Sequence, residues 1–323
     1  IIATMSAVVN LILVYILSGV RAENVFPKVD LPCPSPEDIA PCTCTVSSIG
    51  QSLTLVCNDV AGDEELEQVF HATFPYPYFS KLLLFGNQNI HRIKNETFQN
   101  VTFETMEIHS TTLEFIESGA FKQMSSSLKE LKLYMNQLSD DFPFYSLEKL
   151  EILEVLDLGF NQITIFPVLE IPSIKEIVMS HNLVGGINPD TFSHFPKLEE
   201  VVFNNNPIKT LPTEMFNNHT KLTYINFWEI GLTELKAGTF DLSTDTLSKL
   251  GLAYNNISHV EPGTFKGVSK FSLVYMENNN LTALDEDVYG EMVADDYVQI
   301  LLSNSPLKCD TELIQTARVP AFR

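Results

Sequence analysis

The sequence predicts an α/β-type solenoid, in which a parallel sheet of about ten strands forms the concave side and short helical or irregular segments form the convex side. An apolar frame recurs in steps of 21 to 26 residues, a period typical of solenoid repeats. Hydrophobic residues make up 45% of the 323 residues, so the chain can form a packed core although its formal net charge is −21. That charge argues against nucleic acid and anionic membranes as partners.

The frame has the form LxxLxLxxNxL, and its central LxL pair ends at positions 84, 108, 133, 158, 179, 203, 227, 252, 276 and 302. Alternate residues of a strand point to opposite faces, so the LxL pair enters the core while its neighbours face outward. The asparagine amide satisfies backbone groups where the chain leaves the strand, and Thr111, Ile230 and Ser305 stand in its place in three copies. A recurring phenylalanine is predicted to fill the core on the convex side: Phe98, Phe121, Phe192, Phe216, Phe240 and Phe265.

Residues 1–22 are predicted to be a secretory signal peptide. Met5 precedes an apolar run that ends at Leu17, and the small residues of Val20-Arg21-Ala22 suit cleavage after Ala22. A membrane anchor is the alternative, but the run is shorter than the roughly 20 residues that span a bilayer. No later stretch is long and apolar enough to span one, so we expect no membrane insertion of the mature chain as given.

Four of the five cysteines, Cys33, Cys42, Cys44 and Cys57, lie close together after this segment. In an exported chain such clustering favours disulfide bonds over a zinc site, and the sequence alone allows three pairings. Five N-x-[ST] sequons indicate the same compartment, so we expect a secreted, extracellular glycoprotein. The predicted glycosylation sites are Asn95, Asn100, Asn218, Asn256 and Asn280.

With this frame and this cysteine segment, the chain resembles extracellular leucine-rich-repeat proteins, whose fold is a horseshoe-shaped solenoid. The segment CPSPEDIAPCTCTVSSIGQSLTLVC is similar to the N-terminal cap of that family. The resemblance implies that Cys33 pairs with Cys44 and that Cys42 pairs with Cys57. Cys33-Pro34, residues 37–42 and then Glu64-Glu65-Leu66 and Val69-Phe70 are also similar to arthropod secreted proteins related to the non-catalytic subunit of the Oplophorus-type luciferin monooxygenase.

The expected organisation is a signal peptide at 1–22, a cysteine-rich N-terminal cap at 23–78, leucine-rich repeats at 79–305 and an incomplete C-terminal cap at 306–323. Caps of this family often continue as Pro-Leu-x-Cys-x-Cys, whereas Thr311 follows Cys309-Asp310 here. An open solenoid end needs capping, which favours an incomplete sequence at this end. The alternative is that Cys309 is free or pairs between chains.

The common enzyme motifs G-x-S-x-G, H-E-x-x-H, G-x-x-x-x-G-K and G-x-G-x-x-G are absent from the sequence. We therefore predict no catalytic residue, no cofactor and no metal site. The histidines are scattered, with His109 and His181 on different repeats. The carboxylate runs Asp140-Asp141, Asp285-Glu286-Asp287 and Asp295-Asp296 spell no full calcium loop, which favours solvated acidic loops.

Function is therefore expected on the concave face. Exposed Trp and Tyr side chains anchor interfaces, although rings of this kind also cover neighbouring strands. An acidic stripe follows the second to sixth repeats at Glu107, Glu130, Asp157, Glu176 and Glu200, for which a solvated surface is the favoured interpretation. The sequons avoid the strand positions, so glycans there would leave this face open. The candidate partner-binding residues are Tyr224, Trp228, Tyr254, Tyr275, Tyr134, Glu107 and Asp157.

Two functions fit these features. The first is a secreted binding or scaffold protein, which the resemblance extends to a non-catalytic subunit whose extracellular partner is a secreted catalytic chain. The second is the ectodomain of a receptor or adhesion protein whose transmembrane segment follows the given sequence. In the first case luciferin oxidation belongs to a different chain, so this chain is predicted not to be an enzyme.

Overall fold

The computed structural model describes residues 31–47, 52–242, 246–268, 272–294 and 298–308. The predicted signal peptide, the Asp295-Asp296 pair and Cys309 with the residues after it lie outside the described residues.

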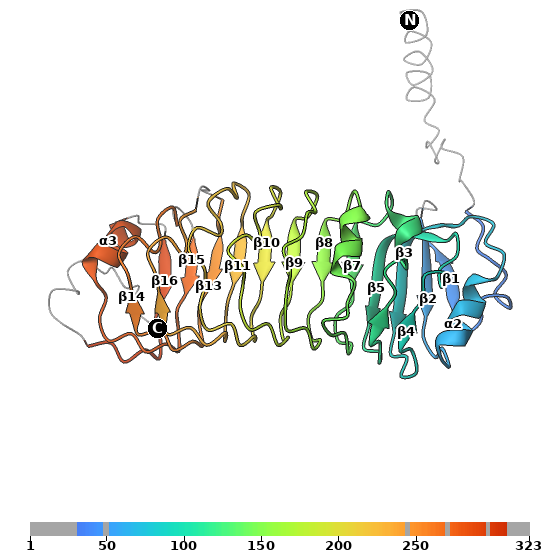
Figure 1. Cartoon of the computed structure of the whole chain (residues 1–323), viewed down its shortest axis with the longest axis horizontal. Helices are drawn as coiled ribbons and strands as arrows, with labels where there is room; N and C mark the ends of the chain where they lie inside the picture. Colours follow the sequence, from blue (N-terminus) through green and yellow to red (C-terminus); the bar gives the residue numbers. More distant parts are fainter. Residues whose placement is uncertain (1–30, 48–51, 243–245, 269–271, 295–297, 309–323) are drawn as a thin grey trace, which may run out of the picture.

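The turns of the chain stack along one long axis, and each adds a strand to one main sheet (Figure 1). Within the described residues this sheet has twelve strands, in the order β1-β2-β3-β5-β7-β8-β9-β10-β11-β13-β15-β16. The ten strands from β3 onward are parallel, so the predicted solenoid with about ten parallel strands is confirmed. They are β3 (Tyr78–Phe85), β5 (Thr102–His109), β7 (Glu130–Lys132), β8 (Val155–Asp157), β9 (Glu176–Val178), β10 (Glu200–Val202), β11 (Tyr224–Asn226), β13 (Lys249–Gly251), β15 (Leu273–Tyr275) and β16 (Gln299–Leu301).

The N-terminal edge of the sheet is closed by a disulfide-linked hairpin. Strand β1 (Thr43–Val46) pairs antiparallel with β2 (Leu53–Cys57), and β2 pairs parallel with β3. Disulfides join Cys33 to Cys44 and Cys42 to Cys57, the pairing that the resemblance implies. Because β1 runs opposite to the repeats, the parallel stacking ends at this edge.

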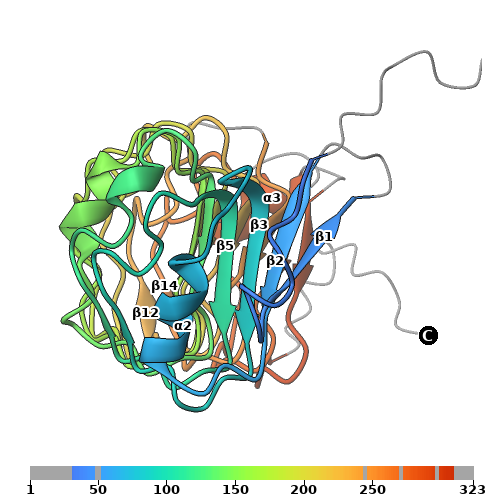
Figure 2. The ribbon, with the colours of Figure 1, turned by 90° about the vertical axis from the view of Figure 1, so that its right-hand side faces the viewer.

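The return segments lie on the other side of the coil from the sheet (Figure 2). They are short and partly helical, as predicted, and the described residues add two small parallel ladders that the frame did not indicate. The six recurring phenylalanines are buried among them. The elements are α2 (Asp63–Phe70), β4 (Arg92–Ile93) with β6 (Phe115–Ile116), η1 (Lys122–Met124), η2 (Phe144–Lys149), β12 (Glu234–Leu235) with β14 (His259–Val260), and α3 (Glu286–Ala294).

The frame asparagines form a buried ladder between successive turns. The Asn182 side-chain amide donates to the carbonyls of Leu158 and Met179 at 2.9 and 3.2 Å, and its Oδ1 accepts the Ile163 N–H at 3.0 Å. One side chain thus satisfies backbone groups of two neighbouring turns, which would otherwise be buried without partners. Where Ile230 replaces asparagine, its own N–H donates to Oδ1 of Asn255 in the next turn at 3.1 Å.

Candidate functional site

The outward-facing residues of the main sheet form a surface that we call the sheet face, which corresponds to the predicted concave face. Parallel pairing places residues of successive turns side by side in rows. One row runs from Glu107 through Lys132 and Asp157, and a second runs from Glu130 on β7 to Glu176 on β9 with one residue between them. Two further pairings, of Glu200 with Glu176 and with Tyr224, continue the second row.

At the N-terminal part of this face, Glu107 is at the centre of a hydrogen-bonded group. Its carboxylate pairs with the Lys81 ammonium and accepts the Tyr134 hydroxyl at 2.8 Å. Partial burial by itself raises the pKa of Glu107, but the two hydrogen bonds together with the charges of Lys81 and His109 outweigh it and hold that pKa below its ordinary value. Burial and the Glu107 hydrogen bond raise the pKa of Tyr134 to about 12. Glu107 is therefore a structurally paired carboxylate.

Three rings stack across the same strands. The His109 ring lies between the Tyr134 and Phe85 rings, with centroid distances of 4.6 and 5.8 Å and interplanar angles of 11° and 14°. Burial lowers the pKa of His109 below its ordinary value. We call Lys81, Glu107, His109, Glu130, Lys132 and Tyr134 the paired region, because Lys132 also neutralises Glu130 at 2.7 Å.

The next three strands carry carboxylates in a different setting. Within the part of the chain that the structure describes, Asp157, Glu176 and Glu200 form no ion pair with Lys, Arg or His. Burial raises the pKa of Asp157 above its ordinary value, against the opposing effects of a 2.9 Å hydrogen bond from the Gly159 N–H and of the Lys132 charge. Burial and then the charge of Glu200 raise the pKa of Glu176. The acidic stripe is thus divided into neutralised and unneutralised halves.

The aromatic candidates meet around Trp228. The Trp228 ring lies 6.0 Å from the Tyr254 ring and 5.7 Å from the Tyr275 ring, between centroids. Tyr224 joins them through Asn226, whose amide donates to the Tyr224 hydroxyl at 2.9 Å and whose Oδ1 accepts the Trp228 N–H at 3.0 Å. The structure therefore brings Tyr224, Trp228, Tyr254 and Tyr275 together, while Tyr134 and Glu107 belong to the paired region.

Gly251 makes room for the indole. A Cβ atom at Gly251 would lie 2.5 Å from Nε1 of Trp228, closer than side chains approach one another. That Nε1 is covered and has no hydrogen-bond acceptor among the described residues. Glycine on β13 thus lets the Trp228 indole pack against the neighbouring turn, a contact that the row pattern alone did not reveal.

Tyr254 lies at the rim of the sheet face rather than on a strand. Its backbone is left-handed, with φ of 56°, and its side chain is 56% exposed. Glu229 and Asn278 occupy this left-handed rim position in the flanking turns, and asparagine tolerates that conformation better than tyrosine. Tyr254 and the sequon residue Asn256 line one hollow of about 610 Å³, so a glycan at Asn256 would lie beside Tyr254.

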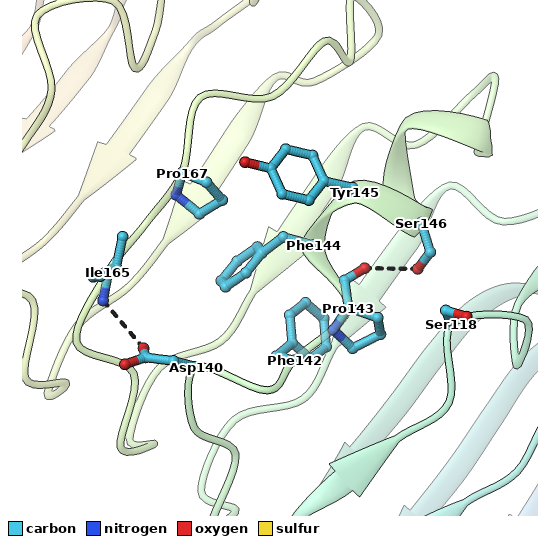
Figure 3. Close-up of a pocket in the computed structure, with 9 residues that line it drawn as sticks. All are labelled: Ser118, Asp140, Phe142, Pro143, Phe144, Tyr145, Ser146, Ile165 and Pro167. Carbon is cyan, nitrogen blue, oxygen red and sulfur yellow. Dashed lines mark hydrogen bonds between the residues drawn. The ribbon is translucent and has the colours of Figure 1, made fainter.

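All five sequon asparagines are exposed, and none lies in a strand of the main sheet. A second hollow of about 420 Å³ lies on the opposite side of the coil, between η2 and the next turn (Figure 3). Its lining is mostly apolar, with Phe142, Phe144 and Pro167 grouped beside Tyr145, which is 65% exposed. Sequence reasoning named none of these residues, since they belong to no recurring row.

No group of three or more His, Cys, Asp or Glu is arranged to hold a metal ion in the described ranges. Among those same residues, no helix has the length and apolar character that crossing a bilayer requires.

Comparison with known proteins agrees with the repeat. The leucine rich repeat model matches residues 172–241 and 245–294, and the model of the BspA type leucine rich repeat region matches residues 83–185. The Oplophorus-luciferin 2-monooxygenase non-catalytic subunit of Oplophorus gracilirostris is 30% identical over 312 residues, which cover 95% of this chain and 86% of that protein. The chain belongs to the leucine-rich-repeat family. It is a leucine-rich-repeat relative of that non-catalytic subunit.

Solved structures share the leucine-rich-repeat fold. A chain of the octameric complex of Latrophilin 3, Unc5D and FLRT2 (LRR) has a TM-score of 0.64 at 22% identity, covering 74% of this chain and 73% of its own. The leucine-rich repeat domain of APL1 has a TM-score of 0.54 at 20% identity, covering 71% of this chain and 57% of its own. At these identities the likeness concerns the fold alone.

Proposed function

We propose that this chain is a secreted leucine-rich-repeat scaffold that binds an extracellular protein partner on its sheet face and has no catalytic role of its own. The name of the Oplophorus relative supports a non-catalytic subunit whose partner is a secreted catalytic chain. The two disulfides and the five exposed sequons support an extracellular, glycosylated protein.

One observation carries the proposal: the contact of Trp228 with Tyr254 and Tyr275 on the sheet face. Tryptophan and tyrosine bury much area at low entropic cost, and their polar groups pair with a partner, so they dominate binding energy at protein interfaces. The rings project from strands and rim positions whose backbone is held by the asparagine ladder. Binding a partner therefore requires no large rearrangement of the backbone.

The test is capture of the partner from the extracellular fluid of the source organism, by crosslinking to the tagged chain followed by mass spectrometry. The variant is Trp228→Ala with Tyr254→Asn, because alanine and asparagine already occupy these positions in neighbouring turns, at Ala253 and Asn278. Removing two interface aromatics is expected to weaken capture by at least about tenfold.

Tyr145→Ala is the matched control, since Tyr145 is an exposed aromatic on the opposite side of the coil. The control is expected to capture the partner like the unchanged chain, and all three proteins should unfold at similar temperatures. Undiminished capture by the double variant would refute binding through the sheet face. Light emission from the purified chain with luciferin and oxygen alone would refute the non-catalytic role.

A further inference from the structure

The carboxylates of β8, β9 and β10 lie on adjacent strands, and within the described residues none of them forms an ion pair. Glu176 and Glu200 are direct neighbours in the parallel pairing of β9 with β10, which places their Cβ atoms about 5 Å apart. Lys132 neighbours Asp157 by register, but its ammonium is bound to Glu130 at 2.7 Å. The sheet face therefore keeps like charges side by side at a cost to stability.

The aromatic cluster continues directly from these carboxylates. Glu200 pairs in register with Tyr224, which is linked through Asn226 to Trp228. Electron-rich faces of tryptophan and tyrosine attract ammonium and guanidinium groups, and nearby carboxylates strengthen that attraction. The exposed Lys249 on β13 is the register neighbour of Tyr224 on its other side.

The residues between Tyr134 and Trp228 in the outer row are small, namely Gly159, Ser180 and Asn204. Three strand spacings separate β8 from β11, which is about 14 Å. An extended segment of about four or five residues covers that distance. We call this surface the acidic–aromatic patch, formed by Asp157, Glu176, Glu200, Tyr224, Trp228 and Tyr275.

We propose that the acidic–aromatic patch binds an extended, arginine-containing basic segment of the partner protein, an inference that rests on the proposed function. Arginine fits both the acidic and the aromatic half of the patch, because its planar guanidinium forms bidentate hydrogen bonds to carboxylates and stacks on aromatic rings. The segment would supply the ion-pair partners that Lys81 and Lys132 give to Glu107 and Glu130 and that, in the part of the chain the structure describes, the patch carboxylates lack.

The probe is a short peptide that alternates arginine with glycine, and the same peptide with glutamate in place of arginine is the negative control. Trp228 is the only tryptophan of the chain, so its fluorescence reports binding at the patch directly. The patch variant is Asp157→Asn with Glu176→Gln and Glu200→Gln. The matched variant is Glu37→Gln with Glu64→Gln and Glu151→Gln, three exposed carboxylates away from the sheet face with the same change in net charge.

The arginine peptide is expected to change Trp228 fluorescence, and the glutamate peptide is not. The patch variant should bind the arginine peptide about tenfold or more weakly, and the matched variant less than about twofold more weakly. Equal weakening in both variants would overturn the inference, because net charge alone would then explain binding. Unchanged binding by the patch variant, or no binding by the unchanged chain, would overturn it as well.

Partner capture separates this inference from the proposed function. If the partner is lost by Trp228→Ala with Tyr254→Asn but retained by the patch variant, the proposed function stands and the basic segment is wrong. If both variants retain the partner, both proposals fail. The patch variant is expected to be at least as stable as the unchanged chain, since it removes like charges, so lost binding is not explained by unfolding.

Discussion

On β5 and β7 the acidic residues of the sheet face form ion pairs with lysines, whereas among the described residues those on β8, β9 and β10 form none. Glu107 pairs with Lys81 and Glu130 pairs with Lys132, while Asp157 and Glu176 keep raised pKa values because burial and neighbouring carboxylates oppose their ionisation. Both regions stand on the same ladder of asparagines and the same buried apolar pairs. The difference therefore lies in surface chemistry rather than in the scaffold, and it separates a surface stabilised within the chain from one suited to a partner.

The largest expected effect tests whether the scaffold is equal beneath both regions. Asn136 under the paired region and Asn182 under the acidic–aromatic patch each hold backbone groups of two turns. Asn136→Ala and Asn182→Ala should each lower the free energy of unfolding by about 3 kcal/mol, because each leaves several buried groups unpaired. Denaturant unfolding measures this. A large difference in the free energy of unfolding between the two variants would show that the two regions differ in their scaffold as well as in their surface chemistry.

The second prediction concerns the paired region. Glu107→Gln removes the charge that binds Lys81, so the free energy of unfolding at neutral pH should fall by about 1–2 kcal/mol. Glu154→Gln is the control, because its pair with Lys175 is more exposed and should contribute less than about 0.5 kcal/mol. Since the pKa of Glu107 is lowered, its contribution is present above the ordinary value of 4.5 and is lost as the pH falls through the lowered value. A smaller loss for Glu107→Gln than for the control would contradict the pairing argument.

The third prediction has the opposite sign. Glu176→Gln should raise the free energy of unfolding at neutral pH, by up to about 1 kcal/mol, because ionised Glu176 faces Glu200 on β10, Asp157 on β8 and Glu130 on β7, with Lys132 on β7 the nearby cation. Its raised pKa means that the folded state binds the proton more tightly than the unfolded state. Stability therefore falls as the pH rises above 4.5 toward the raised value, and the variant should flatten this dependence.

Thermal and denaturant unfolding across that pH range measure the effect of Glu176→Gln. Glu151→Gln is the control, since the Glu151 side chain is exposed on the opposite side of the coil and its neutralisation should leave the free energy of unfolding nearly unchanged. A destabilised Glu176→Gln protein would show that the patch carboxylates are satisfied within the chain.

The smallest expected effect concerns the indole. Gly251→Ala places a Cβ 2.5 Å from Nε1 of Trp228, so the ring must shift. We expect a change in Trp228 emission and weaker binding of the arginine peptide, with a stability change below about 1 kcal/mol. Gly186→Ala, where a Cβ meets no atom within 4 Å, should leave emission unchanged. Equal emission spectra for both variants would contradict the packing of Trp228 on Gly251.

Much of the site was predictable because outward positions follow from the strand period. The rows that contain Glu107, Asp157 and Trp228 emerge once the LxL pairs are aligned. In a parallel solenoid, equivalent residues of successive repeats lie side by side in the sheet. The role of Lys81 was not predicted, although the same alignment places it beside Thr105, which is two residues before Glu107 on β5. Row position indicates neighbours, but the direction of a long side chain depends on what surrounds it.

The sequence by itself determined the ten-turn solenoid and the set of residues that share the sheet face. The repeated LxL pairs and ladder asparagines allow little else, because each turn must bury the same apolar stripe against its neighbours and satisfy the same backbone groups. Only the tertiary structure decided which carboxylates are neutralised and how Trp228 lies over Gly251. Some of those contacts join residues about one turn apart in the chain, and others involve a side chain with several possible partners nearby. They therefore form only once the turns have stacked.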